Sequence, residues 1–157
     1  MSFLKNANFA NGAAPWVPFN HAESIAFTIG GVAESPFSGG GFLRFQTSVS
    51  GGSMAVDFDA FNSNGYLPHQ WITTVGAVLY VRACPGVGSV SGTVAFWELK
   101  SRDPNYNNPT TAFHVSENWT PLFLCIDLGN IFLPRLRLEI YLDTLNAGLD
   151  VGAVWIA

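Results

Sequence analysis

Charged residues are scarce in this sequence, and basic residues are scarcer than acidic ones. Only 11% of the residues are charged, whereas about 25% is usual for a soluble domain. Seven Lys and Arg stand against eleven Asp and Glu, which gives a net charge of −4. Because nucleic acid is bound by clustered cations that neutralise phosphates, we expect no nucleic-acid partner. The surface must instead be built from Ser, Thr, Asn, Gly and aromatic residues, which suits an extracellular or cell-surface protein.

Long apolar runs and cysteines are also lacking. No run approaches the ~20 apolar residues of a membrane-spanning helix, so we expect no membrane partner. The N-terminal "MSFLKNANF" lacks the apolar core of a signal peptide, and we expect none in this chain. Two cysteines, Cys84 and Cys125, are too few for a disulfide framework, and their spacing fits no zinc pattern. We expect two buried or half-buried thiols that are not bonded to each other.

Helical periodicity is nearly absent, and short alternating runs separated by Gly, Pro, Asn and Ser take its place. This pattern is typical of an antiparallel β-sandwich or barrel. The length of 157 residues, without a repeat or a linker, predicts one domain over residues 1–157. Ten strands are predicted, near 3–9, 24–32, 41–47, 53–60, 76–84, 91–99, 110–115, 119–127, 135–142 and 149–156.

Alternation along these strands predicts which side chains face the core, because successive side chains point to opposite faces. In 135–143 the four residues Leu136, Leu138, Ile140 and Leu142 share the inward face. The same argument turns Leu122, Leu124, Ile126, Leu79, Val81, Val94 and Phe96 inward. It leaves two outer faces with aromatic side chains: Trp97 and Tyr141 on one, Tyr80 and Phe123 on the other.

The order of several phrases resembles the carbohydrate-binding modules of the galactose-binding-like jelly-roll type. The matching phrases are "LKNANFANGAAPW", "GFLRFQTSVSGGSMAVDF", "VLYVRACPG", "GTVAFWELK", "FHVSENWTPLFLCIDL" and "LRLEIYLDTLNAGLDVGAV". The resemblance covers nearly the whole chain and implies an all-β fold, an antiparallel jelly-roll β-sandwich of two sheets. One sheet would contain 76–84, 119–127 and 149–156, and the other 53–60, 91–99, 110–115 and 135–142. Trp16 and Trp119 match core tryptophans of such modules.

The resemblance also implies a non-catalytic protein that binds an oligo- or polysaccharide on the outward, concave face of the second sheet. Flat aromatic rings would stack on the apolar faces of the sugars, and Arg and Glu would hydrogen-bond their hydroxyls. The site residues implied in this way are Phe19, Trp97, Tyr106, Arg137, Glu139 and Tyr141, with His114 nearby.

Similar modules commonly hold a structural calcium ion between an acid of an "NPGFE"-like phrase and an acid of an "LDVDD"-like phrase. Here the phrases read "NANFA" and "LDVGA", which places Ala10 and Gly152 where acids would be expected. Calcium needs six to eight oxygen ligands, usually including carboxylates. We therefore expect no metal and no other cofactor.

We expect no enzyme. The three histidines, His21, His69 and His114, lie in different segments and form no recognisable catalytic motif. Glycosidases need two carboxylates facing one substrate. Glu98 and Glu139 are expected on neighbouring strands but on opposite faces of the sheet.

An alternative function is a structural subunit of an oligomer, coat or extracellular filament built on the same fold. The other outer face would carry Tyr80, Phe123, Cys125 and Trp155 with only Arg82 charged, whereas a solvated sheet face is normally polar. Self-association through this face and cover by the N-terminal strand or a loop both remain open.

Overall fold

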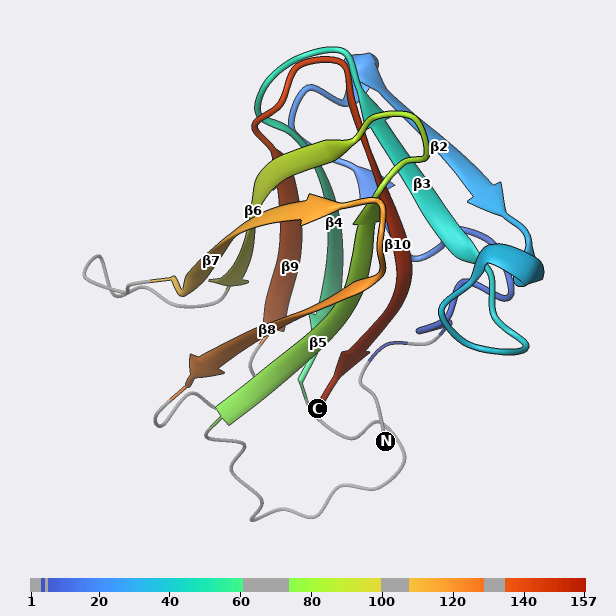
Figure 1. Cartoon of the computed structure of the whole chain (residues 1–157). Coiled ribbons are helices and arrows are strands. Elements are labelled where there is room, and N and C mark those ends of the chain that lie inside the picture. Colours follow the sequence, from blue (N-terminus) through green and yellow to red (C-terminus); the bar gives the residue numbers. More distant parts are fainter. Residues whose placement is uncertain (1–3, 5, 61–73, 100–107, 129–134) are drawn as a thin grey trace.

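Two antiparallel five-stranded sheets pack face to face in this computed structural model, which describes residues 4, 6–60, 74–99, 108–128 and 135–157 (Figure 1). The first sheet has the order β1-β4-β9-β6-β7, with β1 (Val17–Pro18), β4 (Gly52–Asp59), β9 (Arg135–Leu142), β6 (Ser89–Glu98) and β7 (Thr110–Ser116). The second has the order β2-β3-β10-β5-β8, with β2 (Ile25–Gly30), β3 (Phe42–Thr47), β10 (Ala147–Ile156), β5 (Thr74–Ala83) and β8 (Thr120–Asp127). Two 3-10 helices, η1 (Ala22–Ser24) and η2 (Val32–Glu34), flank β2. The predicted all-β jelly-roll sandwich and its division into two sheets are confirmed.

The core lies between the sheets and is built by the predicted alternation. Leu136, Leu138, Ile140 and Leu142 of β9 are fully buried there. Leu79 and Val81 of β5, Val94 and Phe96 of β6, and Leu124 and Ile126 of β8 are buried from the other strands. Each such side chain contributes roughly 1.5–3 kcal/mol through removal of apolar surface from water. The residues that alternate with these core positions therefore lie on the outer faces of the two sheets.

The N-terminal strand predicted over 3–9 is wrong for the part of it that is described. Asn6 and Phe9 have positive φ angles of 59° and 55°, which end an extended conformation. The Asn6 side chain accepts from the Asn11 N–H over 3.0 Å and donates to the Gly12 carbonyl over 2.8 Å, so the chain turns here. The segment still docks on the sandwich, because the Ala7 carbonyl accepts from the Val154 N–H over 2.8 Å.

The two tryptophans expected in the core take different places. Trp16 is buried among the core residues, as predicted. Trp119 is half-buried on the outer face of the second sheet, so that expectation is wrong. Its indole N–H donates to the Glu34 carbonyl over 3.0 Å, and its ring packs edge-on to Phe42 at 6.0 Å. Trp119 lies just before β8. Its side chain is two and three alternations away from those of Phe123 and Cys125, so it points outward as they do.

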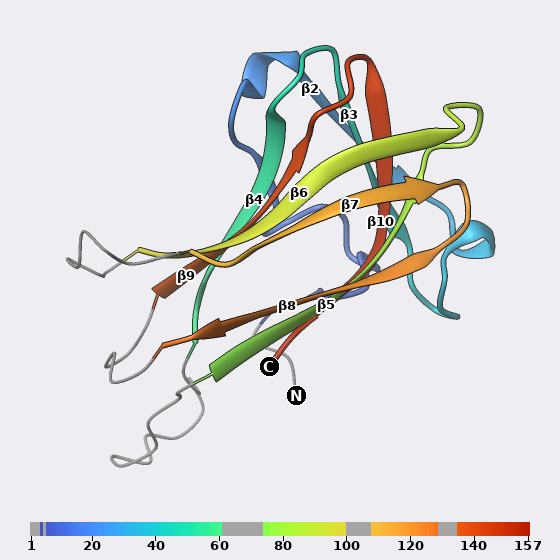
Figure 2. The same cartoon turned by 60° about the vertical axis from the view of Figure 1, so that its left-hand side comes forward.

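The cysteines are not bonded to each other, as predicted. Cys84 follows β5 and is buried. Cys125 lies near the far end of β8, where it pairs with Gly76, and is exposed. The expected burial is therefore right for Cys84 and wrong for Cys125. In Figure 2, β8 continues from β7 through a short turn and forms the edge of its sheet; Cys125 is exposed because it alternates with the buried Leu124 and Ile126.

Candidate functional site

The outer face of the first sheet gathers five of the six predicted site residues: Phe19, Trp97, Arg137, Glu139 and Tyr141. We call it the Trp97 face. Antiparallel pairing of β4, β9 and β6 arranges its residues in three rows across the sheet: Asp57–Arg137–Trp97, Ala55–Glu139–Ala95 and Ser53–Tyr141–Thr93. Tyr106, the sixth predicted residue, lies outside the described residues.

Arg137 is held rigidly at the first row. Its Nε and Nη2 donate to the two carboxylate oxygens of Asp57 over 2.7 and 3.0 Å. The hydrogen bonds to Asp57 raise the pKa of Arg137 above its ordinary value, against the lowering effect of burial. The guanidinium carbon lies 4.1 Å from the ring centre of Phe19, within cation–π range.

Phe19 belongs to this face although it precedes the sheet in sequence and lies outside its strands. Its N–H donates to the carbonyl of Ser53 over 2.9 Å, which ties it to the beginning of β4. The ring is exposed, and Arg137 covers one part of it. The hydrogen bond to Ser53 and the contact with Arg137 therefore explain why Phe19 lies at this sheet face.

Glu139 occupies the middle row and is buried, although it points away from the core. Only 2% of its surface is exposed. Ser53 Oγ donates to its Oε1 over 2.5 Å. Ala55 and Ala95, its neighbours across the sheet, are also buried. The carboxylate is thus part of the sheet surface beneath the larger side chains, and it is not among the groups that this face offers to a ligand.

Trp97 and Tyr141 lie in the two rows that flank the row of Glu139. Burial of the Tyr141 hydroxyl, followed by its interaction with Glu139, raises the pKa of Tyr141 above its ordinary value. Trp97 keeps 36% of its surface exposed. The outward direction predicted for Trp97 is confirmed.

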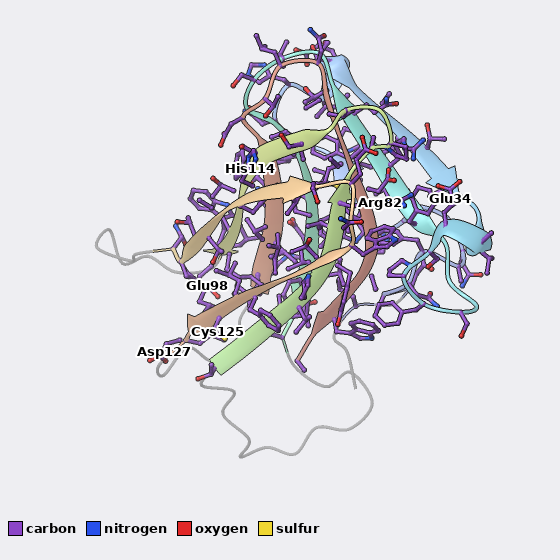
Figure 3. The ribbon with its side chains drawn as sticks, viewed as in Figure 1. Glu34, Arg82, Glu98, His114, Cys125 and Asp127 are labelled. Atoms are coloured by element: carbon purple, nitrogen blue, oxygen red, sulfur yellow. The ribbon has the colours of Figure 1, made fainter. Side chains whose placement is uncertain are left out.

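Two polar partners on this face were not predicted. Ser53 and Asp57 follow the alternation of β4, which points them outward with Glu139 and Arg137 as neighbours. Since 53–60 was recognised as a strand, the same alternation in "SMAVDFD" could have found them. His114 lies at the edge of this face on β7, where its Nδ1 is 2.7 Å from Ser91 Oγ (Figure 3).

The outer face of the second sheet is partly covered. Phe37, from the segment 31–41 between β2 and β3, packs edge-on to Tyr80 at 4.8 Å and to Trp155 at 5.0 Å. Trp155 remains 39% exposed and Phe123 is exposed too, in one row across β10, β5 and β8. A loop therefore covers part of the apolar patch, and the rest faces solvent.

A buried ion cluster lies beside this patch. Asp150 is fully buried and accepts from Arg44 over 2.7 and 3.0 Å and from Arg82 over 3.0 Å. Arg82 also donates to Glu34 over 2.9 Å (Figure 3). The Cys84 thiol donates to Asp150 over 3.2 Å. Burial raises the pKa of Cys84 to about 12, with the Asp150 charge as the next cause.

The residues around Gly152 do not fit the calcium site that the resemblance would place there. Gly152 is the extra residue of a β-bulge in β10. A Cβ atom there would lie 2.4 Å from two ring carbons of Pro36 and 2.9 Å from Trp119, so an acid cannot be accommodated without rearrangement. Asp150, the neighbouring acid, is already paired with two arginines. Among the described residues no group of three His, Cys, Asp or Glu is placed to hold a metal ion.

No protein-family model matches the chain, and no curated protein matches it. Solved structures do. A family 61 carbohydrate-binding module in complex with β-1,4-galactotriose is 9% identical, covers 100% of this chain and 98% of its own, and has a TM-score of 0.67. The family 22 xylan-binding domain of Paenibacillus barcinonensis Xyn10C is 14% identical, covers 96% and 90%, and has a TM-score of 0.64.

A third similar structure is a much larger protein. The enzymatically active domain of tailspike protein 4 from bacteriophage CBA120 is 7% identical with a TM-score of 0.67, and the match covers 99% of this chain but 21% of that one. The chain therefore has the jelly-roll fold that carbohydrate-binding modules share. Within the described residues, no helix is long and apolar enough to cross a membrane.

Proposed function

We propose that this chain is a non-catalytic carbohydrate-binding module that binds a glycan across the Trp97 face. One observation carries the proposal: Trp97 lies outward on a sheet whose inner side is the core, yet more than a third of it stays exposed. The indole lies in one row with Arg137, whose guanidinium packs on the exposed ring of Phe19. Two exposed rings and a guanidinium gathered on one sheet face suit a surface that receives a ligand. The fold shared with modules that bind galactotriose and xylan supports the same function.

The chemistry of the Trp97 face suits a sugar. Aromatic rings are amphipathic platforms, and the C–H faces of pyranose rings are apolar enough to stack on them. Trp97 provides the main platform, and Phe19 and Tyr141 lie at its sides. Arg137 uses Nε and Nη2 for Asp57, which leaves Nη1 as the nitrogen that would donate to sugar hydroxyls. Tyr106 stays a proposed rim residue on the strength of the resemblance.

The glycan is uncharged. Arg137 is paired with Asp57, and Arg135 with Asp59 over 3.2 Å in the next row of the same two strands. Each cation on the described part of this face thus has its own carboxylate. A uronate or sulfate group would have to compete with Asp57 and Asp59 for the two arginines. A neutral oligo- or polysaccharide can bind without breaking these ion pairs.

The same pairs support a non-catalytic function. Glycoside hydrolysis needs one carboxylic acid and one carboxylate directed at the substrate. Glu139 is buried against Ser53 and Tyr141, and Asp57 is committed to Arg137. Neither carboxylate is available for proton transfer or attack. The site also works without metal, and an extracellular or cell-surface location fits a protein that meets polysaccharides.

A glycan array tests the proposal directly. The wild-type protein should bind at least one neutral glycan, and the Trp97→Ala variant should lose that binding. Trp155→Ala is a matched control, because Trp155 is almost equally exposed but lies on the other sheet. Binding by none of the three proteins, or equal binding by all three, contradicts the proposed site.

Self-association is a second candidate function, favoured by the exposed row of Phe123 and Trp155. A subunit of a coat or filament would bury this row against another copy. Light scattering of the purified protein distinguishes the two: a stable oligomer that Phe123→Ser dissolves supports assembly, and a monomer at high concentration contradicts it.

A further inference from the structure

Asp57 and Arg137 form an ion pair in the same row of the sheet as Trp97. The two residues are directly opposite each other on β4 and β9, and Trp97 is opposite Arg137 on β6. Because the side chains of one row share one face, the ion pair lies beside the Trp97 ring. Neighbouring strands are ~4.8 Å apart, so the backbones of Trp97 and Asp57 are separated by roughly 10 Å. A sugar stacked on Trp97 would therefore lie close to the Asp57 carboxylate.

The ion pair occupies the edge of Arg137 that can bind an anion through two parallel hydrogen bonds. Nε donates to one carboxylate oxygen of Asp57 over 2.7 Å, and Nη2 donates to the other over 3.0 Å. The Phe19 ring centre lies 4.1 Å from the guanidinium carbon and covers another side of the group. Since 23% of the Arg137 side chain is still exposed, the guanidinium is within reach of a ligand.

Arg135 and Asp59 form the equivalent pair in the next row of the same two strands, and this pair is more open. Nη1 of Arg135 donates to one oxygen of Asp59 over 3.2 Å, and 43% of the Arg135 side chain is exposed. Asp59 therefore occupies its arginine less completely than Asp57 does. The two aspartates carry the same charge on the same strand, which makes Asp59 a matched control for Asp57.

We propose that Asp57 is a specificity-determining residue, which excludes acidic glycans from the Trp97 face. A uronate or sulfate group bound there would find this edge of Arg137 occupied and would lie close to a carboxylate of like charge. Both effects act against an anionic ligand and leave a neutral one unaffected, which is specificity through repulsion. The Asp57→Asn variant keeps the size of the side chain and removes its charge, so it should open Arg137 to acidic glycans. The proposal rests on the proposed function for the place where the glycan binds.

The first test needs no glycan and uses inorganic sulfate at constant ionic strength. NMR follows the Nε–H signal of Arg137, which is assigned by its loss in Arg137→Lys. Sulfate should leave this signal in place in the wild-type protein and shift it in a saturable way in Asp57→Asn. Asp59→Asn removes the same charge and should behave as the wild type does. A wild-type shift as large as that of Asp57→Asn, or no shift in either protein, overturns the proposal.

The second test compares two forms of one ligand by calorimetric titration. They are a neutral oligosaccharide that the array identifies and the same oligosaccharide with one hydroxymethyl group oxidised to a carboxylate. The wild-type protein should bind the neutral form roughly tenfold more tightly, because of the repulsion by Asp57. Asp57→Asn should remove most of this difference, and its affinity for the oxidised form should fall with added salt. Asp59→Asn should retain most of the difference.

Equal wild-type affinities for the two forms overturn the proposal, as does an unchanged difference in Asp57→Asn. An equal effect of Asp59→Asn also overturns it, because the total charge of the face would then set the specificity. If no neutral glycan binds the wild-type protein, the proposed function fails, and the sulfate titration still decides whether Asp57 closes Arg137 to anions.

Discussion

The Trp97→Ala variant shows whether Trp97 is a ligand-binding residue or a core residue. The two roles differ in the expected loss of unfolding free energy and in the expected loss of affinity for the glycan. About two thirds of Trp97 is buried, since 36% is exposed. A fully buried Trp or Phe costs ~3–5 kcal/mol when truncated to alanine, so two thirds of that range gives a loss of about 2–3 kcal/mol. Trp16 exposes 4% and should cost the full ~3–5 kcal/mol. Trp155→Ala should match Trp97→Ala in stability, because the two exposures are nearly equal.

The affinity for the glycan should then distinguish Trp97→Ala from Trp155→Ala. A tryptophan at the centre of a binding site contributes at least ~2 kcal/mol, which is roughly 30-fold in Kd. We expect that loss for Trp97→Ala and no change for Trp155→Ala. Urea unfolding gives the stabilities, and calorimetric titration with the glycan that the array identifies gives the affinities. Equal affinities, or a loss of stability from Trp97→Ala as large as that from Trp16→Ala, would refute the reasoning.

Three further outcomes are expected. Asp150→Asn should lower the free energy of unfolding by ~3–5 kcal/mol, because two arginines lose a buried partner; a loss below 1 kcal/mol in urea unfolding would contradict this. Cys125 should react with a thiol reagent in the folded protein and Cys84 only after unfolding, since burial raises the pKa of Cys84 to about 12; two fast thiols would contradict it. Millimolar calcium should leave the Tm unchanged, because Pro36 fills the space an acid at Gly152 would need; a Tm that rises with calcium and falls with chelator would disprove it.

The strands and their faces could be predicted because alternation is a local signal with a fixed period. "LRLEIYL" at 136–142 contains its own inward and outward sets, and the core took the inward one. Alternation also gave the outward direction of Trp97. The strand predicted for the N-terminal segment was wrong, because Asn6 and Phe9 adopt positive φ angles in a turn. The hydrogen bonds of that turn are not encoded by alternation.

The candidate site was predicted as a set of residues, but the role of each depends on its neighbours. Glu139 points outward as expected and is buried all the same, with Ser53 Oγ of the neighbouring strand donating to its carboxylate. Such burial depends on packing between strands, which the alternation within one strand does not encode. Gly152 is similar: its absent side chain follows from a β-bulge packed against Pro36, and the sequence alone predicted only a missing acid.

Fluorine NMR of protein labelled with fluorotryptophan tests the central claim most directly, because it reports on each indole separately. On titration with a soluble neutral oligosaccharide, the Trp97 signal should shift in proportion to the bound fraction. The signals of Trp16 and Trp155 should stay in place, since one is in the core and the other lies on the opposite sheet. An oligosaccharide that binds, moves the Trp155 signal and leaves Trp97 unmoved would contradict the assignment of the glycan site to the Trp97 face.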